Sequence, residues 1–224
     1  MRTHTEFFSF TKLARATGAS VVARLAMVCN DLAIANSSMG RYKDMKSKAL
    51  NHVVQGARMY FVRVSCGHLN EGVQIIGEVR DHPSLANLLS RCGSEAQSAF
   101  TDLCACLPKG NEHKKFERYV GWIRNRVAFH YGANDVNWAL GDRANKSNSG
   151  TCSMTLGEDI HSSRFEFADA ILDTIVCRRL WQIPVKADVR AEADRISDWC
   201  FQKSLQFLVF GEDFVRRFLK NYAA

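Results

Sequence analysis

One stretch decides how the fold is predicted: Trp122-Ile123-Arg124-Asn125-Arg126-Val127-Ala128-Phe129-His130-Tyr131. At about 100° per residue, its helical spacing extends a single apolar stripe that begins upstream. The stripe comprises Phe116, Tyr119, Val120, Ile123, Val127 and Tyr131. His130 falls inside this stripe, and Arg124 and Arg126 lie at its two margins. The stretch therefore predicts an amphipathic helix, and leaves open whether His130 is a hydrogen-bonded core residue or a functional group.

Composition favours an all-α protein. The chain has 224 residues, 46% of them hydrophobic, and three prolines at Pro83, Pro108 and Pro184, each between periodic segments. We expect one helical domain over residues 1–224, a single bundle with long antiparallel helices. The spacing predicts helices at about 20–37, 45–80, 84–92, 94–107, 111–132, 165–182 and 187–222. Residues 132–164 are rich in Asn, Ser, Gly and Thr and predict a loop-rich insertion, with a possible short hairpin around Met154 and Phe165.

The net charge of +7 favours a polyanionic partner such as nucleic acid. Basic residues are nevertheless scattered. The densest pairs are Arg178-Arg179 and Arg216-Arg217, which we interpret as solvated faces unless the fold brings them beside His130.

Eight cysteines are spread singly through apolar segments, without the paired spacing of metal ligands, and are predicted to be reduced and buried. Cys104 and Cys106, the one close pair, would point about 200° apart on a helix and could not chelate one ion together. We expect no metal site and no cofactor. The apolar run from Val21 to Ala35 is short and interrupted by charge, which predicts an internal helix rather than a membrane span. The expected location is cytoplasmic, with no membrane association.

The long helix predicted from Met45 has an apolar seam interrupted by two polar residues, His68 and Glu71. Both are expected on the inward face, where a carboxylate needs a partner. One interpretation is that Glu71 pairs with a core arginine and has only a structural role. The other is that it orients Arg124 or Arg126 for phosphate binding, with His68 beside it.

The segment Arg124-Asn125, followed after four residues by His130, resembles the signature of the HEPN superfamily. In that signature an arginine, usually followed by a polar residue, precedes a histidine by about four to six residues. The resemblance is specific from Phe116 to Tyr131 and otherwise rests on helical character alone. It implies a helical bundle, usually homodimeric, and often a metal-independent endoribonuclease of toxin–antitoxin, phage-defence or RNA-processing systems. Some members of the superfamily are inactive.

Under this resemblance, neutral His130 takes the proton from an RNA 2′-hydroxyl while Arg124 binds the phosphate oxygens. Asn125, Arg126 and Tyr131 are expected to support the site or bind substrate. Straight-helix geometry favours Arg126, about 40° from His130, over Arg124, about 120° away, so the principal arginine stays open. The expected partners are RNA, a second copy of the chain and an antitoxin or other protein. The alternatives are an inactive binding module for RNA, nucleotide or protein, and an unrelated basic helical protein.

Overall fold

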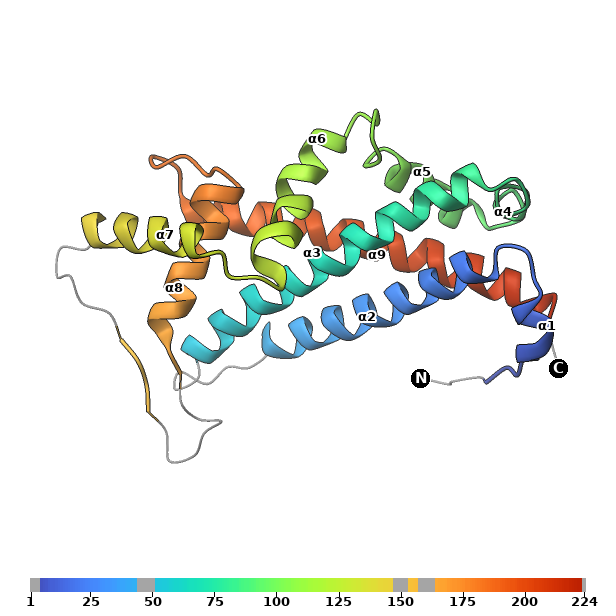
Figure 1. Cartoon of the computed structure of the whole chain (residues 1–224), viewed down its shortest axis with the longest axis horizontal. Coiled ribbons are helices and arrows are strands. Elements are labelled where there is room, and N and C mark those ends of the chain that lie inside the picture. Colours follow the sequence, from blue (N-terminus) through green and yellow to red (C-terminus); the bar gives the residue numbers. More distant parts are fainter. Residues whose placement is uncertain (1–4, 44–50, 147–152, 157–163, 223–224) are drawn as a thin grey trace. The chain divides into compact units, whose positions relative to one another are not determined.

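The computed structural model describes residues 5–43, 51–146, 153–156 and 164–222 (Figure 1). These residues confirm the all-α fold class, and their β structure is limited to isolated bridges, one of which is antiparallel and pairs Thr155 with Arg164. The elements are, in order, α1 (Phe10–Ala14), α2 (Ala19–Lys43), α3 (Asn51–Asp81), α4 (Pro83–Leu89), α5 (Ser94–Cys104), α6 (His113–Phe116), the π-helical η2 (Glu117–Gly121) and η3 (Arg124–Ala128), α7 (Ala133–Lys146), α8 (Glu166–Thr174), the π-helical η4 (Ile175–Leu180) and α9 (Val189–Lys220).

The chain forms two compact units, and each long helix contributes residues to both. The first unit comprises residues 1–33, 68–114 and 202–224, and the second comprises residues 34–67 and 115–201. Each is described by itself below.

In the first unit, ion pairs fix the packing of α2 on α3. The Nη1 of Arg24 lies 2.9 Å from the Oε1 of Glu78, and the Nδ1 of His68 lies 3.2 Å from the Oδ2 of Asp31. Because the α2 partner number rises as the α3 number falls, these two stretches run antiparallel. Gly72 allows close contact with α9, since a Cβ there would come within 2.6 Å of the Phe207 ring.

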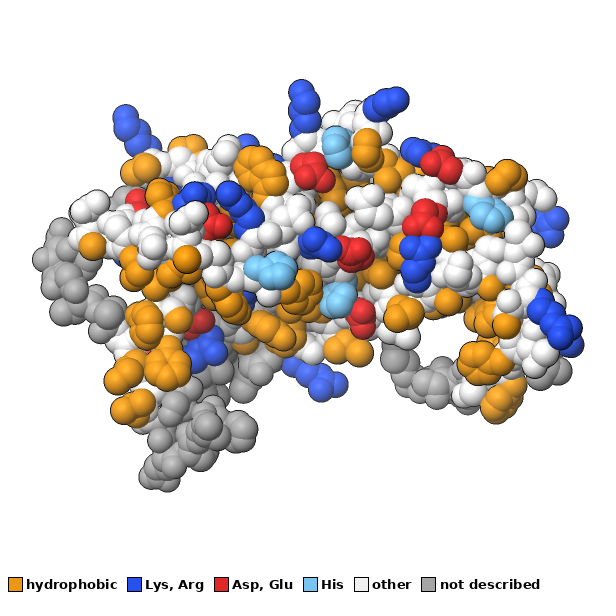
Figure 2. Space-filling view, viewed as in Figure 1, with side chains coloured by type: hydrophobic (Ala, Val, Ile, Leu, Met, Phe, Trp, Pro, Cys, Tyr) orange, Lys and Arg blue, Asp and Glu red, His pale blue; other side chains and the backbone are white. Residues whose placement is uncertain are grey.

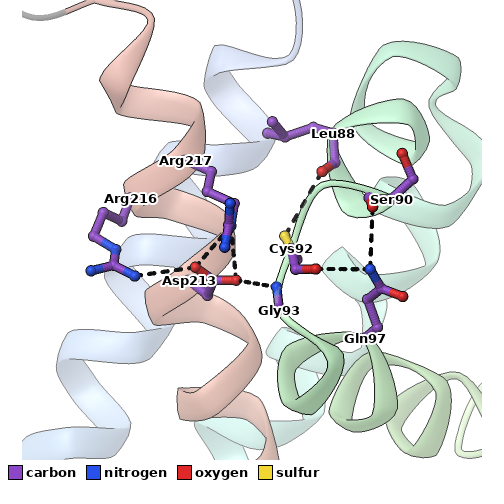
Figure 3. A network of polar contacts seen from close by, with 8 residues as sticks. All are labelled: Leu88, Ser90, Cys92, Gly93, Gln97, Asp213, Arg216 and Arg217. Atoms are coloured by element: carbon purple, nitrogen blue, oxygen red, sulfur yellow. Dashed lines mark hydrogen bonds and ion pairs between the residues drawn. The ribbon is translucent and has the colours of Figure 1, made fainter.

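The turn between α4 and α5 is held to α9 by one carboxylate, Asp213 (Figure 3). Its Oδ2 accepts the backbone N–H of Gly93 at 2.8 Å, while Arg217 donates Nε to both oxygens at 2.9 Å and Arg216 donates to Oδ1 at 3.3 Å. Gln97 closes the same turn by donating to the carbonyl of Cys92 at 2.8 Å. Burial raises the pKa of Asp213, but the hydrogen bonds from Arg217, Gly93 and Arg216 outweigh it and hold the pKa below its usual value.

In the second unit, the core is built around Trp181, which is fully buried. Its indole Nε1 donates to the carbonyl of Tyr119 at 3.1 Å, and its own carbonyl accepts the Nε of Arg118 at 2.9 Å. Tyr119 also meets the ring of Trp199 edge-on at 5.6 Å between centroids. These contacts join η2 to η4 and α9, while α7 packs against α8 (Figure 1).

The predicted loop-rich insertion at 132–164 is wrong over its first half, because residues 133–146 form α7. The sequence of α7 is rich in Asn, Gly and Asp, which predicted a loop, but one face of the helix is buried at Asp135 and Ala139. Near Met154 and Phe165, where a hairpin was expected, the described residues include the antiparallel bridge between Thr155 and Arg164. The predicted start of the long helix at Met45 and the thiol of Cys152 lie outside the described residues.

The predicted seam of α3 is wrong by about one residue. The most regular series of buried positions on the helix is Val62, Cys66, Leu69, Val73 and Ile76, and Ile75 and Val79 are buried as well. This series is rotated by about one residue from the line through His68 and Glu71, so Glu71 is exposed and His68 is half-buried. Glu71 therefore does not incur the desolvation cost that would make a charged partner necessary.

The described cysteines are all free thiols, buried or half-buried, which agrees with the prediction of reduced residues. Burial raises the pKa of the Cys29 and Cys177 thiols to about 12. Within the described ranges, no group of three or more His, Cys, Asp and Glu side chains is arranged to hold a metal. His113 lies instead with Nδ1 3.0 Å from the carbonyl oxygen of Cys106.

One described segment, Ala19–Arg41 of α2, is long and apolar enough to cross a membrane by length and composition alone. Helices that line the core of a soluble protein pass the same test, and Val22, Leu25 and Leu32 of this segment are buried.

Candidate functional site

The segment that carries the motif is helical from His113 to Ala128, with π-helical turns over η2 and η3. Its apolar stripe is confirmed as far as Val127, since Phe116, Val120, Ile123 and Val127 are all buried. The opposite face exposes Arg124, Asn125 and Arg126. π-Helical turns in proteins occur frequently at functional sites.

The helix ends before His130, which corrects the prediction that it continues to residue 132. Phe129 has φ −130° and ψ 4°, outside helical geometry, and His130 and Tyr131 follow it in exposed positions. His130 is therefore neither part of the buried stripe nor a core histidine. The 120° separation between Arg124 and His130 assumed a straight helix, so it no longer applies.

A buried arginine that sequence analysis missed holds this helix end. Arg63 on α3 is only 5% exposed, and its Nη1 donates to the carbonyl of Val127 at 2.7 Å. Carbonyls in the last turn of a helix have no intrahelical partner, so this bond caps η3. The Arg63 guanidinium also lies 5.9 Å from the ring centroid of Tyr131. Arg63 thus contacts residues on both sides of His130.

The ring of Phe129 packs against α3 at Gly67. A Cβ at Gly67 would lie 2.8 Å from the Cε2 of Phe129, so a larger residue there would displace the ring. The chain therefore leaves η3 across the surface of α3, with Phe129 against Gly67 and Val127 bonded to Arg63. Sequence patterns gave no signal for either contact, because both are tertiary.

Arg124 and Asn125 contact each other directly. The Nη1 of Arg124 donates to the Oδ1 of Asn125 at 3.1 Å. The amide therefore biases the orientation of the guanidinium while leaving both side chains exposed.

Arg126 belongs to a different cluster, centred on Asp135 in the first turn of α7. The Nε of Arg126 lies 3.8 Å from Oδ2 of Asp135, and the Nε of Arg179 on η4 lies 2.9 Å from Oδ1. The side chain of Asp135 is only 9% exposed, against 47% for Arg126 and 29% for Arg179. Sequence analysis placed Arg178 and Arg179 on a solvated face. Arg179 pairs with Asp135 as described above, and Arg178 donates a hydrogen bond to the carbonyl of Ile183 at 2.9 Å.

A shallow pocket of about 350 Å³ opens beside this cluster. Its lining residues are Trp122, Asn125, Arg126, Arg179 and Gln182. Two of these, Asn125 and Arg126, belong to the predicted site, whereas Arg124 and His130 are not among the lining residues. Sequence reasoning missed Arg179 and Gln182 because packing, and not spacing, brings them to the motif, and it gave no role to Trp122, which is part of the motif stretch.

The remaining supporting residues, His68 and Glu71, lie on the part of α3 that belongs to the first unit. His68 pairs with Asp31, and Glu71 is exposed. The pairing of Glu71 with Arg124 or Arg126 stays a prediction. The carboxylate that contacts Arg126 is Asp135.

On the face drawn in Figure 2, lysine and arginine side chains are spread among carboxylates rather than gathered in one basic patch. Local clusters therefore matter more for anion binding than the net charge of +7. No family model matches the chain, and comparisons with curated proteins and with solved structures found no match.

Proposed function

We propose that this chain is a metal-independent endoribonuclease of the HEPN type, with His130 as the base and Arg124 as the principal phosphate-binding residue. The observation that carries the proposal is the helix end at Ala128, which leaves His130, Arg124 and Asn125 all exposed. The interpretation of His130 as a hydrogen-bonded core residue required burial, whereas its exposed position leaves the imidazole within reach of a substrate.

The chemistry follows from the two side chains. Neutral His130 accepts the proton of an RNA 2′-hydroxyl, and the resulting oxygen attacks the adjacent phosphorus. The bond from phosphorus to the 5′ oxygen breaks, leaving a 2′,3′-cyclic phosphate and a 5′-hydroxyl that takes its proton from water. Arg124 binds the non-bridging oxygens, where negative charge develops, with a planar fork that meets two oxygens at once. The hydrogen bond to Asn125 restricts the orientation of that fork.

A second candidate function is an HEPN-like binding module without catalysis. The pocket favours it, because that cavity is lined by Asn125 and Arg126 and not by His130. In this alternative the arginines hold RNA, a nucleotide or an acidic protein segment, and His130 has no role in bond cleavage.

The decisive experiment incubates the purified protein with mixed RNA in EDTA. We expect cleavage to persist, His130→Ala to abolish it, and His82→Ala, a histidine change in the first unit, to leave it intact. The helical circular dichroism spectrum should be the same for all three proteins. Arg124→Lys keeps the charge but removes the bidentate fork, so we expect a large loss of activity. Cleavage that requires a divalent cation, or that survives His130→Ala, contradicts the proposal.

We further propose a homodimer, with an antitoxin or other protein as a possible partner and the cytoplasm as the location. Phe129 and Tyr131 leave 58% and 66% of their surfaces exposed beside His130, which suits burial against a second copy. If the copies complete each other's sites, mixing the inactive Arg124→Ala and His130→Ala variants restores cleavage. A strictly monomeric mass with no restoration contradicts the dimer and leaves the single-chain activity in place.

A further inference from the structure

The pocket beside the motif combines two cations with one aromatic face. Arg126 and Arg179 contribute two positive charges, and Asp135 behind them contributes one negative charge. One unit of positive charge is therefore left for a ligand. The volume of about 350 Å³ lies at the small end of the range for ligand pockets, which suits one nucleotide unit.

Arg179 is held in place before any ligand binds. Its Nε pairs with Asp135 at 2.9 Å, and its guanidinium lies 5.3 Å from the ring centroid of Trp138. Its Nη1 also donates to the carbonyl of Asn134 at 3.4 Å. Asp135 is itself favourably placed, because it lies in the first turn of α7, where the helix dipole stabilises a negative charge. A guanidinium fixed in this way loses less conformational freedom when it binds a phosphate.

Trp122 and Gln182 also line the pocket. Trp122 leaves 36% of its surface exposed, so part of its indole is available for stacking. Gln182 has φ 55°, in the left-handed region that residues other than glycine rarely adopt. The buried Trp181 immediately before it is fixed by its hydrogen bond to Tyr119. This anchor holds Gln182 at the pocket, where its amide offers both a donor and an acceptor.

We infer that this pocket binds one unpaired nucleotide of a single-stranded RNA, with the base on Trp122 and its phosphate between Arg126 and Arg179. The inference rests on the proposed function and gives it a substrate class. Stacking on an aromatic ring requires an unpaired base, so the pocket selects single strands over duplex. Asn125 lines the pocket and also contacts Arg124, so the bound nucleotide is next to the arginine that binds phosphate in the proposed chemistry.

The test measures binding apart from cleavage. A fluorescein-labelled oligouridylate of about six nucleotides is titrated into the full chain carrying His130→Ala, and its affinity is read from anisotropy at fixed salt. We expect Arg179→Gln and Trp122→Leu each to weaken binding about tenfold. Arg126→Gln is a second test of the phosphate contact that disturbs packing less, because Arg126 is more exposed and its ion pair is longer. The matched control is Arg80→Gln, an exposed arginine of the first unit with its own carboxylate partner, Asp81.

The outcomes separate the pocket from the nuclease. Equal affinities for all four variants, or the same loss in Arg80→Gln, overturn the pocket. Undiminished affinity for a fully paired RNA duplex overturns the selection of single strands. Adenosine 5′-monophosphate that binds as tightly as the oligonucleotide identifies a free nucleotide as the ligand and overturns the assignment to RNA. If the unmodified chain fails to cleave RNA while Arg179→Gln and Trp122→Leu still weaken binding, the nucleotide pocket is supported and the proposed nuclease activity is contradicted. If the unmodified chain cleaves RNA but Arg179→Gln and Trp122→Leu leave the affinity unchanged, the proposed nuclease activity is supported and the proposed nucleotide pocket is contradicted.

Discussion

Two clusters in this molecule have the same composition, one aspartate and two arginines, and opposite construction. Around Asp213, both arginines come from the same helix, three and four residues onward, and the carboxylate also accepts a backbone N–H from the α4–α5 turn (Figure 3). Around Asp135, the arginines come from η3 and η4, which are distant in sequence, and they line a pocket. The first cluster uses its cations to stabilise a carboxylate that joins two elements. The second uses its carboxylate to hold cations that face solvent.

Breaking the first cluster should have the largest effect on stability. Asp213→Asn removes the charge that receives the hydrogen bonds of Arg217, Arg216 and Gly93, and we expect a loss of about 2 kcal/mol in the free energy of unfolding at pH 7. Chemical denaturation measures it. Asp81→Asn, which removes an exposed carboxylate paired with its neighbour Arg80, should change stability by less than about 0.5 kcal/mol.

The pH dependence of that loss tests its cause. The pKa of Asp213 is lower in the folded chain than in the unfolded chain, where it is about 4. The contribution of Asp213 to the free energy of unfolding is therefore complete above the unfolded pKa and is lost as the pH falls through the lower folded pKa. The stability difference between the unmodified chain and Asp213→Asn should therefore be constant near neutrality and shrink in acid. A difference that is the same in acid and at neutrality would mean that packing, and not charge, is lost.

Asp135→Asn should have a smaller effect, about 1 kcal/mol of destabilisation, because Arg126 and Arg179 remain partly exposed and can be solvated by water. Differential scanning calorimetry measures it. The control is Asp194→Asn, which breaks the more exposed pair with Arg58 in the same unit. Equal and negligible changes in both variants would show that the arginines of the pocket do not depend on Asp135.

The smallest effect concerns a third carboxylate, Asp173, which sharpens the comparison because its pKa moves in the opposite direction. Asp173 is exposed as a residue, but the surrounding chain shields its carboxyl group from water. This desolvation, together with the negative charge of nearby Asp169, raises the pKa of Asp173 to about 6. The folded chain therefore binds this proton more tightly than the unfolded chain, and the contribution of Asp173 to stability falls as the pH rises from about 4 to about 6. Carboxyl-carbon NMR titration should find a midpoint near 6, and Asp169→Asn should lower it. A midpoint near 4 contradicts the prediction.

The fold was largely predictable because its long helices have strong apolar periodicity. α5 and α9 agree with their predicted ranges within a few residues, and Phe214 and Phe218 of α9 are buried. α7 was missed because its sequence is polar, and its burial depends on packing against α8. The seam of α3 was misplaced because its amphipathic pattern is weak, since Arg63 is buried and Glu71 exposed.

The candidate site was predictable only where its residues are adjacent in sequence. Arg124, Asn125 and Arg126 are exposed; the resemblance to the HEPN signature singled out Arg124 and Asn125, and helical spacing favoured Arg126. The break before His130 was not predictable, because it accompanies a hydrogen bond from Arg63 and a contact with Gly67, both on another helix. Arg179 was equally hidden, since only tertiary packing brings it to Asp135.

Two cysteine thiols, the half-buried Cys29 and the buried Cys177, can report local opening of the chain. A thiol with a pKa near 12 carries almost no thiolate at neutral pH, so alkylating reagents react with Cys29 and Cys177 mainly after their surroundings open. Cys29 lies in the first unit and Cys177 lies in η4 of the second, two residues from Arg179. The ratio of their labelling rates therefore reports whether the pocket-bearing helix opens independently of the rest of the chain, without any introduced probe.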